Sequence, residues 1–135
     1  MNLKKALTSA ALVVAMSTPL AALADKYAID TDGAHAFVQF RIQHLGYSWL
    51  YGRFNDFGGE FEYDEKAPSK ASVKVEIDTA SIDSNHAERD KHLRSADFLD
   101  TDKFPKATFV STSYEEGKDG KATLQGDLTL HGVTK

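Results

Sequence analysis

The densest group of side chains capable of chemistry lies in one short segment after position 85. It consists of eight ionisable residues: His86, Glu88, Arg89, Asp90, Lys91, His92, Arg94 and Asp97. Several of them are four positions apart, a spacing that places side chains on one face of a helix. Exposed pairs of this kind contribute little to stability. The simplest interpretation is a solvated helix face, and the alternative is a polar rim that binds the head group of a ligand.

Metal binding and catalysis have weaker support in this segment. A His and an Asp four positions apart need further converging ligands to hold a metal, and the chain has no cysteine. A nucleophile elbow and a glycine-rich phosphate loop are also missing from the sequence. We therefore predict a protein that is not an enzyme, with no catalytic residue, no metal site and no cofactor. A small hydrolase using His86, Asp90 and His92 is the alternative.

The residues that flank this segment predict how it is held. Asn85 and Glu88 have the spacing of a capping box, so we expect a short helix over roughly 86–94. Leu93 and Phe98 are apolar and could anchor this helical insert on the rest of the fold. Pro105 lacks a backbone N–H and therefore marks the entry to the next strand.

Alternating apolar and polar residues predict that most of the chain is β-sheet. The pattern is clear over 36–42, 57–63, 73–77 and 122–130, and period-two alternation indicates one dry and one wet face. A first strand at 27–31 and another after Pro105 bring the count to about six. A hairpin turn is expected at 116–121. Gly58 and Gly59 suggest a bulge or bend where the sheet curls towards a barrel.

Residues 46–52 read G-Y-S-W-L-Y-G, an aromatic segment between two glycines. We expect a connection that folds over one end of the barrel, with Trp49 packed as a plug. A second interpretation is a mouth element that contacts a ligand, since small-molecule pockets are commonly lined by such side chains.

The amino-terminal residues predict secretion. Lys4 and Lys5 precede an apolar run from about position 6 to 16, and Ala22-Leu23-Ala24 fits a cleavage site. This pattern indicates a signal peptide cleaved after Ala24, and the run is shorter than the roughly 20 residues of a spanning helix. The predicted domain, 25–135, then has a formal charge of −6 instead of −4. Such a charge disfavours nucleic acid as a partner. With no cysteine for disulfides, burial alone must stabilise the fold.

Two motifs carry a resemblance to a known family. The segment N-H-A-E-R-D-K-H-L-R-S-A-D-F with the later F-P-K-A-T-F, together with R-I-Q-H-L-G-Y-S-W-L-Y-G-R-F near position 50, resembles the YceI family, and the similarity runs over 27–135. The resemblance implies an all-β, lipocalin-like antiparallel up-and-down β-barrel with one short helical insert. It also implies a periplasmic protein whose interior holds a polyisoprenoid, such as a quinone or prenyl phosphate.

Alternation alone does not decide whether a small barrel is filled by side chains or holds a ligand. The resemblance favours a ligand, and a ligand-free interaction module is a further alternative. The residues expected to line the apolar pocket are Val38, Phe40, Ile42, Trp49, Phe61 and Leu128. The residues expected near the head group are Arg89, His92 and Arg94, because guanidinium groups suit phosphate oxygens and an imidazole suits either a phosphate or a quinone carbonyl. We expect a monomer or homodimer.

The strand count leads to one more expectation. A closed barrel that holds a ligand usually needs eight strands, and the sequence predicts about six before it reaches His131. We therefore expect an incomplete barrel that lacks its last strands. Its uncovered dry face and unpaired edges would favour opening or aggregation.

Overall fold

The structure, a computed structural model, describes residues 24–33 and 35–135. The expected signal peptide over 1–24 lies almost wholly outside the described residues. The strands are β1 (Asp25–Ala28), β2 (Val38–His44), β3 (Ser48–Phe54), β4 (Phe57–Tyr63), β5 (Ser72–Asp78), β6 (Ile82–Asp83), β7 (Lys106–Glu116), β8 (Ala122–Leu130) and β9 (Val133–Thr134). One α-helix, α1 (Ala87–Arg94), and two 3₁₀ turns, η1 (Pro68–Lys70) and η2 (Thr79–Ser81), complete the described elements.

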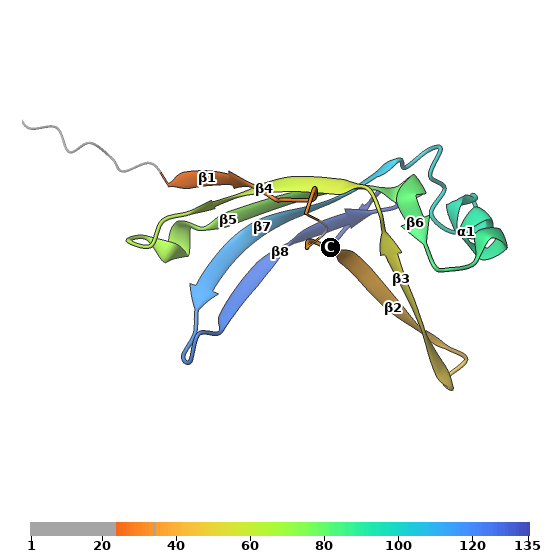
Figure 1. Cartoon of the computed structure of the whole chain (residues 1–135), viewed down its shortest axis with the longest axis horizontal. Coiled ribbons are helices and arrows are strands. Elements are labelled where there is room, and N and C mark those ends of the chain that lie inside the picture. Colours follow the sequence, from red (N-terminus) through yellow and green to blue (C-terminus); the bar gives the residue numbers. More distant parts are fainter. Residues whose placement is uncertain (1–23, 34) are drawn as a thin grey trace, which may run out of the picture.

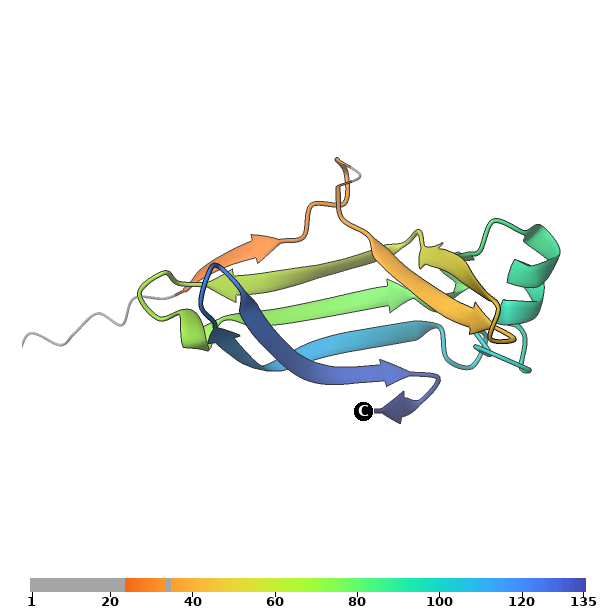
Figure 2. The ribbon, with the colours of Figure 1, turned by 90° about the horizontal axis from the view of Figure 1, so that it is seen from below.

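The strands form two antiparallel sheets. The larger sheet has the order β1-β4-β5-β7-β8-β9 and the smaller one the order β2-β3-β6. Figure 1 shows the larger sheet as a curved layer, with the β2–β3 hairpin projecting from one side of it and α1 beyond β6. Figure 2 shows the long strands of the larger sheet side by side, with β9 at one edge. Over the described residues the two sheets do not close into a barrel.

Register places the apolar residues of the larger sheet on one face. Tyr27 pairs with Phe61, and Phe61 pairs with Val73; Phe109 pairs with Leu128. The Tyr27 and Phe61 rings stack with centroids 4.9 Å apart. The other face is charged and carries ion pairs such as Lys26–Glu60 at 2.7 Å and Lys106–Glu76 at 3.4 Å. This alternation is the one expected of a sheet with a single dry face.

The buried core is small and lies at the end of the sheet near α1. Among the described residues the buried apolar side chains are Ile77, Ile82 and Ala107. Thr79 is buried beside them and donates its Oγ1 hydrogen to the carbonyl of Phe104 at 2.7 Å. Farther along the same face the apolar side chains stay exposed, for example Leu128 with 43% of its surface accessible.

The expected fold class is confirmed, because the described residues form antiparallel sheets with one short helical insert. The strands over 57–63, 73–77 and 122–130 lie where alternation predicts them. The count of about six strands was too low, since β3 and the two-residue strands β6 and β9 were not expected. The first strand begins and ends earlier than expected, at Asp25 and Ala28.

The expectation of a connection at 46–52 was wrong. Strand β3 pairs with β2 along its whole length, from His44 with Ser48 to Val38 with Phe54. The turn between them is at Leu45 and Gly46, both with positive φ (50° and 79°). The segment was hard to recognise as a strand because large aromatic side chains occupy its outer face, where polar ones are usual.

Two local expectations also need correction. The helix cap is His86, whose Nδ1 accepts a hydrogen bond from the Arg89 N–H at 3.2 Å, whereas Asn85 precedes the cap with a φ of 63°. Of the bulge or bend expected at Gly58 and Gly59, the bulge is absent, because the β4–β5 register is unbroken there. The register irregularity lies in β7 between Ser111 and Ser113. Pro105 does precede β7 directly, as expected.

Candidate functional site

An apolar cleft of about 510 Å³ lies where the smaller sheet, the α1 region and the end of β8 meet. Its lining residues are Phe40, Ile42, Phe54, Ile82, Leu93, Phe98, Leu99, Leu130 and His131. Apart from His131, all of these side chains are hydrocarbon. The cleft can therefore hold an apolar group, and it offers very few polar partners.

The β2–β3 hairpin supplies one wall through the alternation of its two strands. Phe40 lies opposite Gly52, and a Cβ at position 52 would overlap the Phe40 ring. Because residue 52 is a glycine, the Phe40 ring has room to lie across β3. The ring centroids of Phe40 and Phe54 are 5.7 Å apart, so two aromatic rings form a continuous apolar wall.

The α1 region supplies the opposite wall. After the helix ends, the chain folds back, with the Leu99 N–H bonded to the Leu93 carbonyl at 3.0 Å and the Asp100 N–H to the Ser95 carbonyl at 2.9 Å. This compact turn brings Leu99 and Phe98 to the cleft beside Leu93. Phe98 is 49% exposed. An exposed aromatic ring at a cleft edge is available to a ligand.

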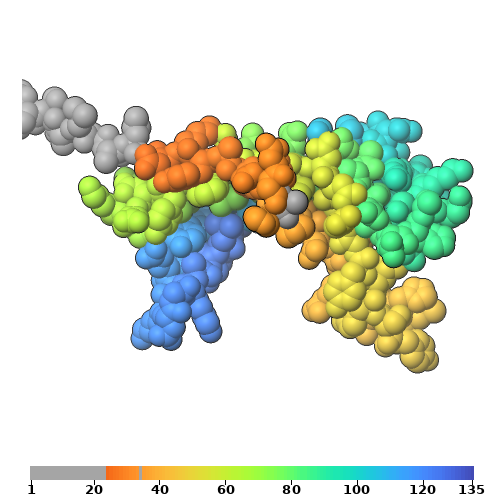
Figure 3. Space-filling model, in the orientation of Figure 1, coloured from red at the N-terminus to blue at the C-terminus, as the bar shows by residue number. Residues whose placement is uncertain are grey.

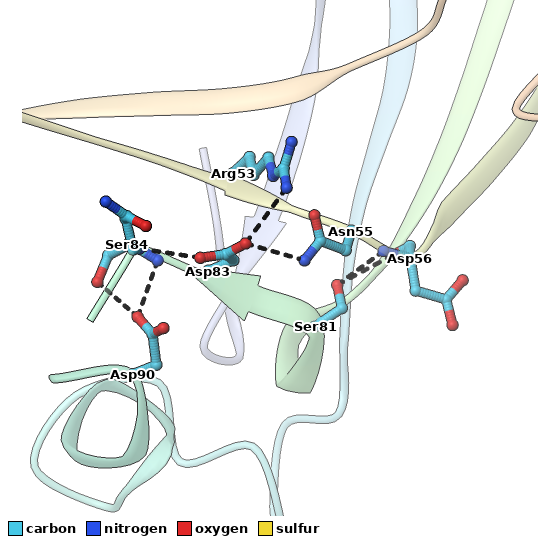
Figure 4. A network of polar contacts seen from close by, with 8 residues as sticks. Arg53, Asn55, Asp56, Ser81, Asp83, Ser84 and Asp90 are labelled. Carbon is cyan, nitrogen blue, oxygen red and sulfur yellow. Dashed lines mark hydrogen bonds and ion pairs between the residues drawn. The ribbon is translucent and has the colours of Figure 1, made fainter. Parts of the chain in front are cut away.

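A polar network joins the two walls, and Figure 4 shows it. The Asp83 carboxylate accepts hydrogen bonds from the Asn85 backbone N–H at 2.9 Å, from the Asn55 side chain at 3.3 Å and from Arg53 at 3.4 Å. These donors, led by the Asn85 N–H, hold the pKa of Asp83 below its ordinary value. The network fixes β6 against the end of β3.

A second set of contacts ties α1 to β6. The Asp90 carboxylate accepts from the Ser84 backbone N–H at 2.8 Å and from its hydroxyl at 2.5 Å, and both residues are buried (Figure 4). Arg89 donates its Nε hydrogen to the Ser84 hydroxyl at 2.8 Å and a terminal N–H to the Ser84 carbonyl. Arg89, a head-group candidate, therefore has a clear structural role.

The other two head-group candidates lie on the last turn of α1. Arg94 donates its Nε hydrogen to the Ala80 carbonyl at 3.0 Å. Among the described residues no hydrogen bond from its terminal nitrogens is found. The His92 Nε2 lies 3.0 Å from an Asp97 carboxylate oxygen. The His92 and Phe98 rings pack edge-on, with their centroids 4.8 Å apart. His92 is therefore next to a residue that lines the cleft.

The six residues expected in the apolar pocket fall into four places. Phe40 and Ile42 line the cleft. Val38 is on the same face of β2 but lines a smaller cavity of about 170 Å³. Phe61 and Leu128 lie on the apolar face of the larger sheet. Trp49 lies one residue before Leu50 on β3, on the opposite face, where the Arg41 guanidinium is 4.5 Å from its ring centroid.

Several cleft residues were not predicted from the sequence. These are Phe54, Ile82, Leu99, Leu130 and His131, together with Leu93 and Phe98, which were expected only as anchors of the helical insert. Pairing of 46–52 as a strand would have placed Phe54 opposite Val38 and next to Ile82 in register. Leu130 belongs to the alternating run of β8, and its approach to the cleft depends on sheet curvature, which no single-strand pattern encodes.

The three residues considered for a hydrolase have different partners. His86 caps α1, Asp90 is bonded to Ser84, and His92 pairs with Asp97. Within the described part of the chain there is no group of three His, Asp or Glu side chains that could hold a metal ion. Over the same residues, no helix has the length and apolar character required to cross a membrane.

Comparisons with known proteins agree with this architecture. The family model of the YceI-like domain matches residues 27–135. A UPF0312 protein of Shewanella sp. strain W3-18-1 is 55% identical over 133 residues, which is 98% of this chain and 70% of that protein. A UPF0312 protein of Pseudomonas aeruginosa strain LESB58 is 59% identical over 133 residues, and the match spans 69% of that protein.

Solved structures show the same fold. A YceI protein of Campylobacter jejuni is 34% identical with a TM-score of 0.61, over 79% of this chain and 63% of that one. BcnA of Burkholderia cenocepacia is 25% identical with a TM-score of 0.65, over 72% of this chain and 60% of that one. The chain thus spans less than two thirds of the length of these structures. With a family model matched along nearly all of its described residues, the chain belongs to the YceI-like domain family.

Proposed function

We propose that this protein binds a polyisoprenoid lipid, either a quinone or a prenyl phosphate, with its apolar tail against the inner face of the sheets. The observation that carries the proposal is the continuity of the apolar surface. Leu130 lines the cleft, and Leu128 lies two residues earlier on the same face of β8, beside Phe109. A long tail could therefore run from the cleft along the larger sheet.

The size and chemistry of this surface suit such a tail. The cleft, at about 510 Å³, falls within the range of roughly 300–1,000 Å³ that is usual for small-molecule sites. Each methylene removed from water contributes about 0.8 kcal/mol. A chain of several isoprene units could thus bind firmly through burial alone, with no catalytic step.

The head group is proposed to lie at the α1 side of the cleft, near His92 and Arg94. His92 contacts Phe98 at the cleft edge, and Arg94 has terminal N–H groups suited to phosphate oxygens. Arg89 is less suited because it already donates twice to Ser84. A prenyl phosphate should depend on Arg94 more than an uncharged quinone does.

We further propose that the protein acts as a carrier or binding protein in the periplasm, after cleavage following Ala24. The basic and apolar amino-terminal sequence supports secretion. A carrier requires an apolar surface and no reactive group, which agrees with a cleft whose lining is almost entirely hydrocarbon.

Organic extraction of the protein purified from its native compartment, followed by mass spectrometry, tests the cargo. We expect a co-purifying polyisoprenoid. Ile42→Asn, inside the cleft, should lower the recovery of lipid, and Gln39→Asn on the opposite face of β2 should not. Repeated extraction without any lipid, and no displaceable binding of a prenyl probe, would show that the proposal is wrong.

A further inference from the structure

The β2–β3 hairpin projects from the body of the molecule with an apolar tip. Figures 1 and 3 show it as an arm separate from the larger sheet. At the turn, Leu45 is 78% exposed and Tyr47 is 93% exposed. Large apolar side chains as exposed as these do not pack within the described fold. Such exposed patches commonly mark a surface that binds a partner.

Both faces of the hairpin near this tip carry exposed apolar or aromatic residues. Trp49 and Tyr51 lie on the outer face, and Ile42 lies on the cleft face. The Arg41 guanidinium lies 4.5 Å from the centre of the Trp49 ring, so a cation and an aromatic ring form one unit. The hairpin is therefore apolar at its tip, at Leu45 and Tyr47, and carries a positive charge on its outer face, at Arg41.

The charge of this region differs from that of the whole chain. Residues 33–55 contain no Asp or Glu, although the chain has 20 of them and a net charge of −4. Arg53 pairs with Asp83. Among the described residues no carboxylate lies within ion-pair distance of Arg41. The hairpin therefore presents an unpaired positive charge on an acidic protein.

We propose that this hairpin docks on the surface of a lipid bilayer that contains anionic phospholipids. Leu45, Tyr47 and Trp49 would enter the interfacial layer, where tryptophan and tyrosine are favoured, and Arg41 would lie among the lipid phosphates. The inference goes beyond the proposed cargo, since docking needs no bound polyisoprenoid. It would, however, bring the cleft face of the same hairpin close to the membrane.

A second copy of the chain is a competing occupant, and the charge pattern argues against it. A symmetric dimer brings the same patch of both copies together, and residues 33–55 of a second copy contain no carboxylate that could pair with Arg41. An anionic bilayer supplies the complementary charge that a second copy lacks.

The single tryptophan of the chain, Trp49, reports on docking directly. Vesicles of phosphatidylglycerol with phosphatidylethanolamine should shift its fluorescence to shorter wavelength, and brominated lipids in those vesicles should quench it. Vesicles of phosphatidylcholine alone, or added salt, should weaken both effects. The signal reports the surroundings of position 49, and variants of the hairpin that leave the amino-terminal apolar run unchanged separate docking of the hairpin from binding through that run.

Matched variants of the full chain separate specific docking from general attraction. Arg41→Gln should weaken binding about fivefold, the loss expected for one basic residue near an anionic surface, and Tyr47→Ser should reduce quenching. Lys118→Gln makes the same charge change in the β7–β8 turn and should leave the affinity unchanged. Circular dichroism checks that each variant folds.

Three results would overturn the proposal. The first is a Trp49 fluorescence spectrum that does not change when anionic vesicles are added at low salt. The second is an equal loss of vesicle affinity for Arg41→Gln and Lys118→Gln. The third is a shift of the Trp49 fluorescence that depends on protein concentration without vesicles. The last would instead identify a second copy as the occupant.

Discussion

Asp90 is a buried carboxylate that holds α1 in place, because it accepts two hydrogen bonds from Ser84. Asp90→Ala would leave a buried N–H and hydroxyl without an acceptor, and each such group costs about 1–3 kcal/mol. We expect Asp90→Ala to lower the free energy of unfolding by at least this amount in urea titrations.

The matched control is Glu88→Ala, which removes the same charge from an exposed position of the same helix. We expect it to cost only a few tenths of a kcal/mol. Asp90→Asn keeps an acceptor oxygen and should fall between the two. Equal stability of Asp90→Ala and Glu88→Ala would contradict a structural role for Asp90.

Asp83 makes folding stability depend on pH in the acid range. Its pKa lies below the ordinary value of 3.8, mainly because the Asn85 N–H and the Asn55 side chain bond to the charged form. A carboxyl group whose pKa is lower in the folded state stabilises the fold above its unfolded pKa, and this contribution is lost as pH falls through the folded value.

Asp83→Asn should therefore lower the free energy of unfolding at neutral pH, and the difference from the original chain should shrink below the ordinary value of 3.8. Urea titrations at a series of pH values measure this difference. A constant difference at all pH values would mean that the charge of Asp83 contributes nothing.

At the scale of elements, Gly52 makes the cleft wall possible. Its missing side chain leaves room for the Phe40 ring, so Gly52→Ala should push that ring towards the cleft. Overpacking of this kind costs typically about 1–3 kcal/mol. We also expect weaker binding of a prenyl probe, measured by displacement.

Gly58→Ala is the matched control, since a Cβ at position 58 in β4 meets nothing within 4 Å. Alanine is favoured over glycine in a strand interior by roughly 0.5–1 kcal/mol. We therefore expect Gly58→Ala to stabilise the protein slightly and to leave probe binding unchanged. A stabilising Gly52→Ala would show that the Phe40 ring can move without cost.

The elements that sequence predicts well are those whose two faces differ in polarity. Phe57, Phe61 and Tyr63 alternate with polar residues, and β4 lies where this pattern indicates. Strand β3 failed this test because Trp49 and Tyr51 occupy its outer face and Gly52 its inner one. The sequence pattern of β3 results from aromatic residues on its exposed face and from a glycine that leaves room for the Phe40 ring. Neither feature can be recognised from β3 alone, without its neighbouring strand.

The candidate site was predictable only in part for a related reason. Phe40 and Ile42 follow from alternation within one strand, and both line the cleft. The approach of Leu130 and Leu99 depends on how β8 curves and how the chain folds after α1. The partners of Arg89 likewise come from Ser84, which precedes the helix and carries no distinctive sequence signal.

At the scale of the whole molecule, the two sheets enclose an inner side that the described residues leave open. Figure 3 shows the space between the β7–β8 turn and the β2–β3 hairpin. Apolar residues of β8 face this side, and Leu124 and Leu128 remain 40% and 43% exposed. Strands β1, β2, β6 and β9 each have one edge without a partner strand among the described residues. Apolar faces and free edges promote association between copies.

We therefore expect the 135-residue chain to associate as its concentration rises when no lipid is present, and a prenyl lipid to reverse this by covering the inner face. Leu124→Lys with Leu128→Lys should also reverse it, since charges on that face oppose contact between copies. Thr123→Lys with Gln125→Lys adds the same charge on the outer face of β8 and should have a much smaller effect. Sedimentation velocity distinguishes these cases. If the unaltered chain stays monomeric at all concentrations, or if both lysine pairs act equally, the inner face is not the surface through which copies meet.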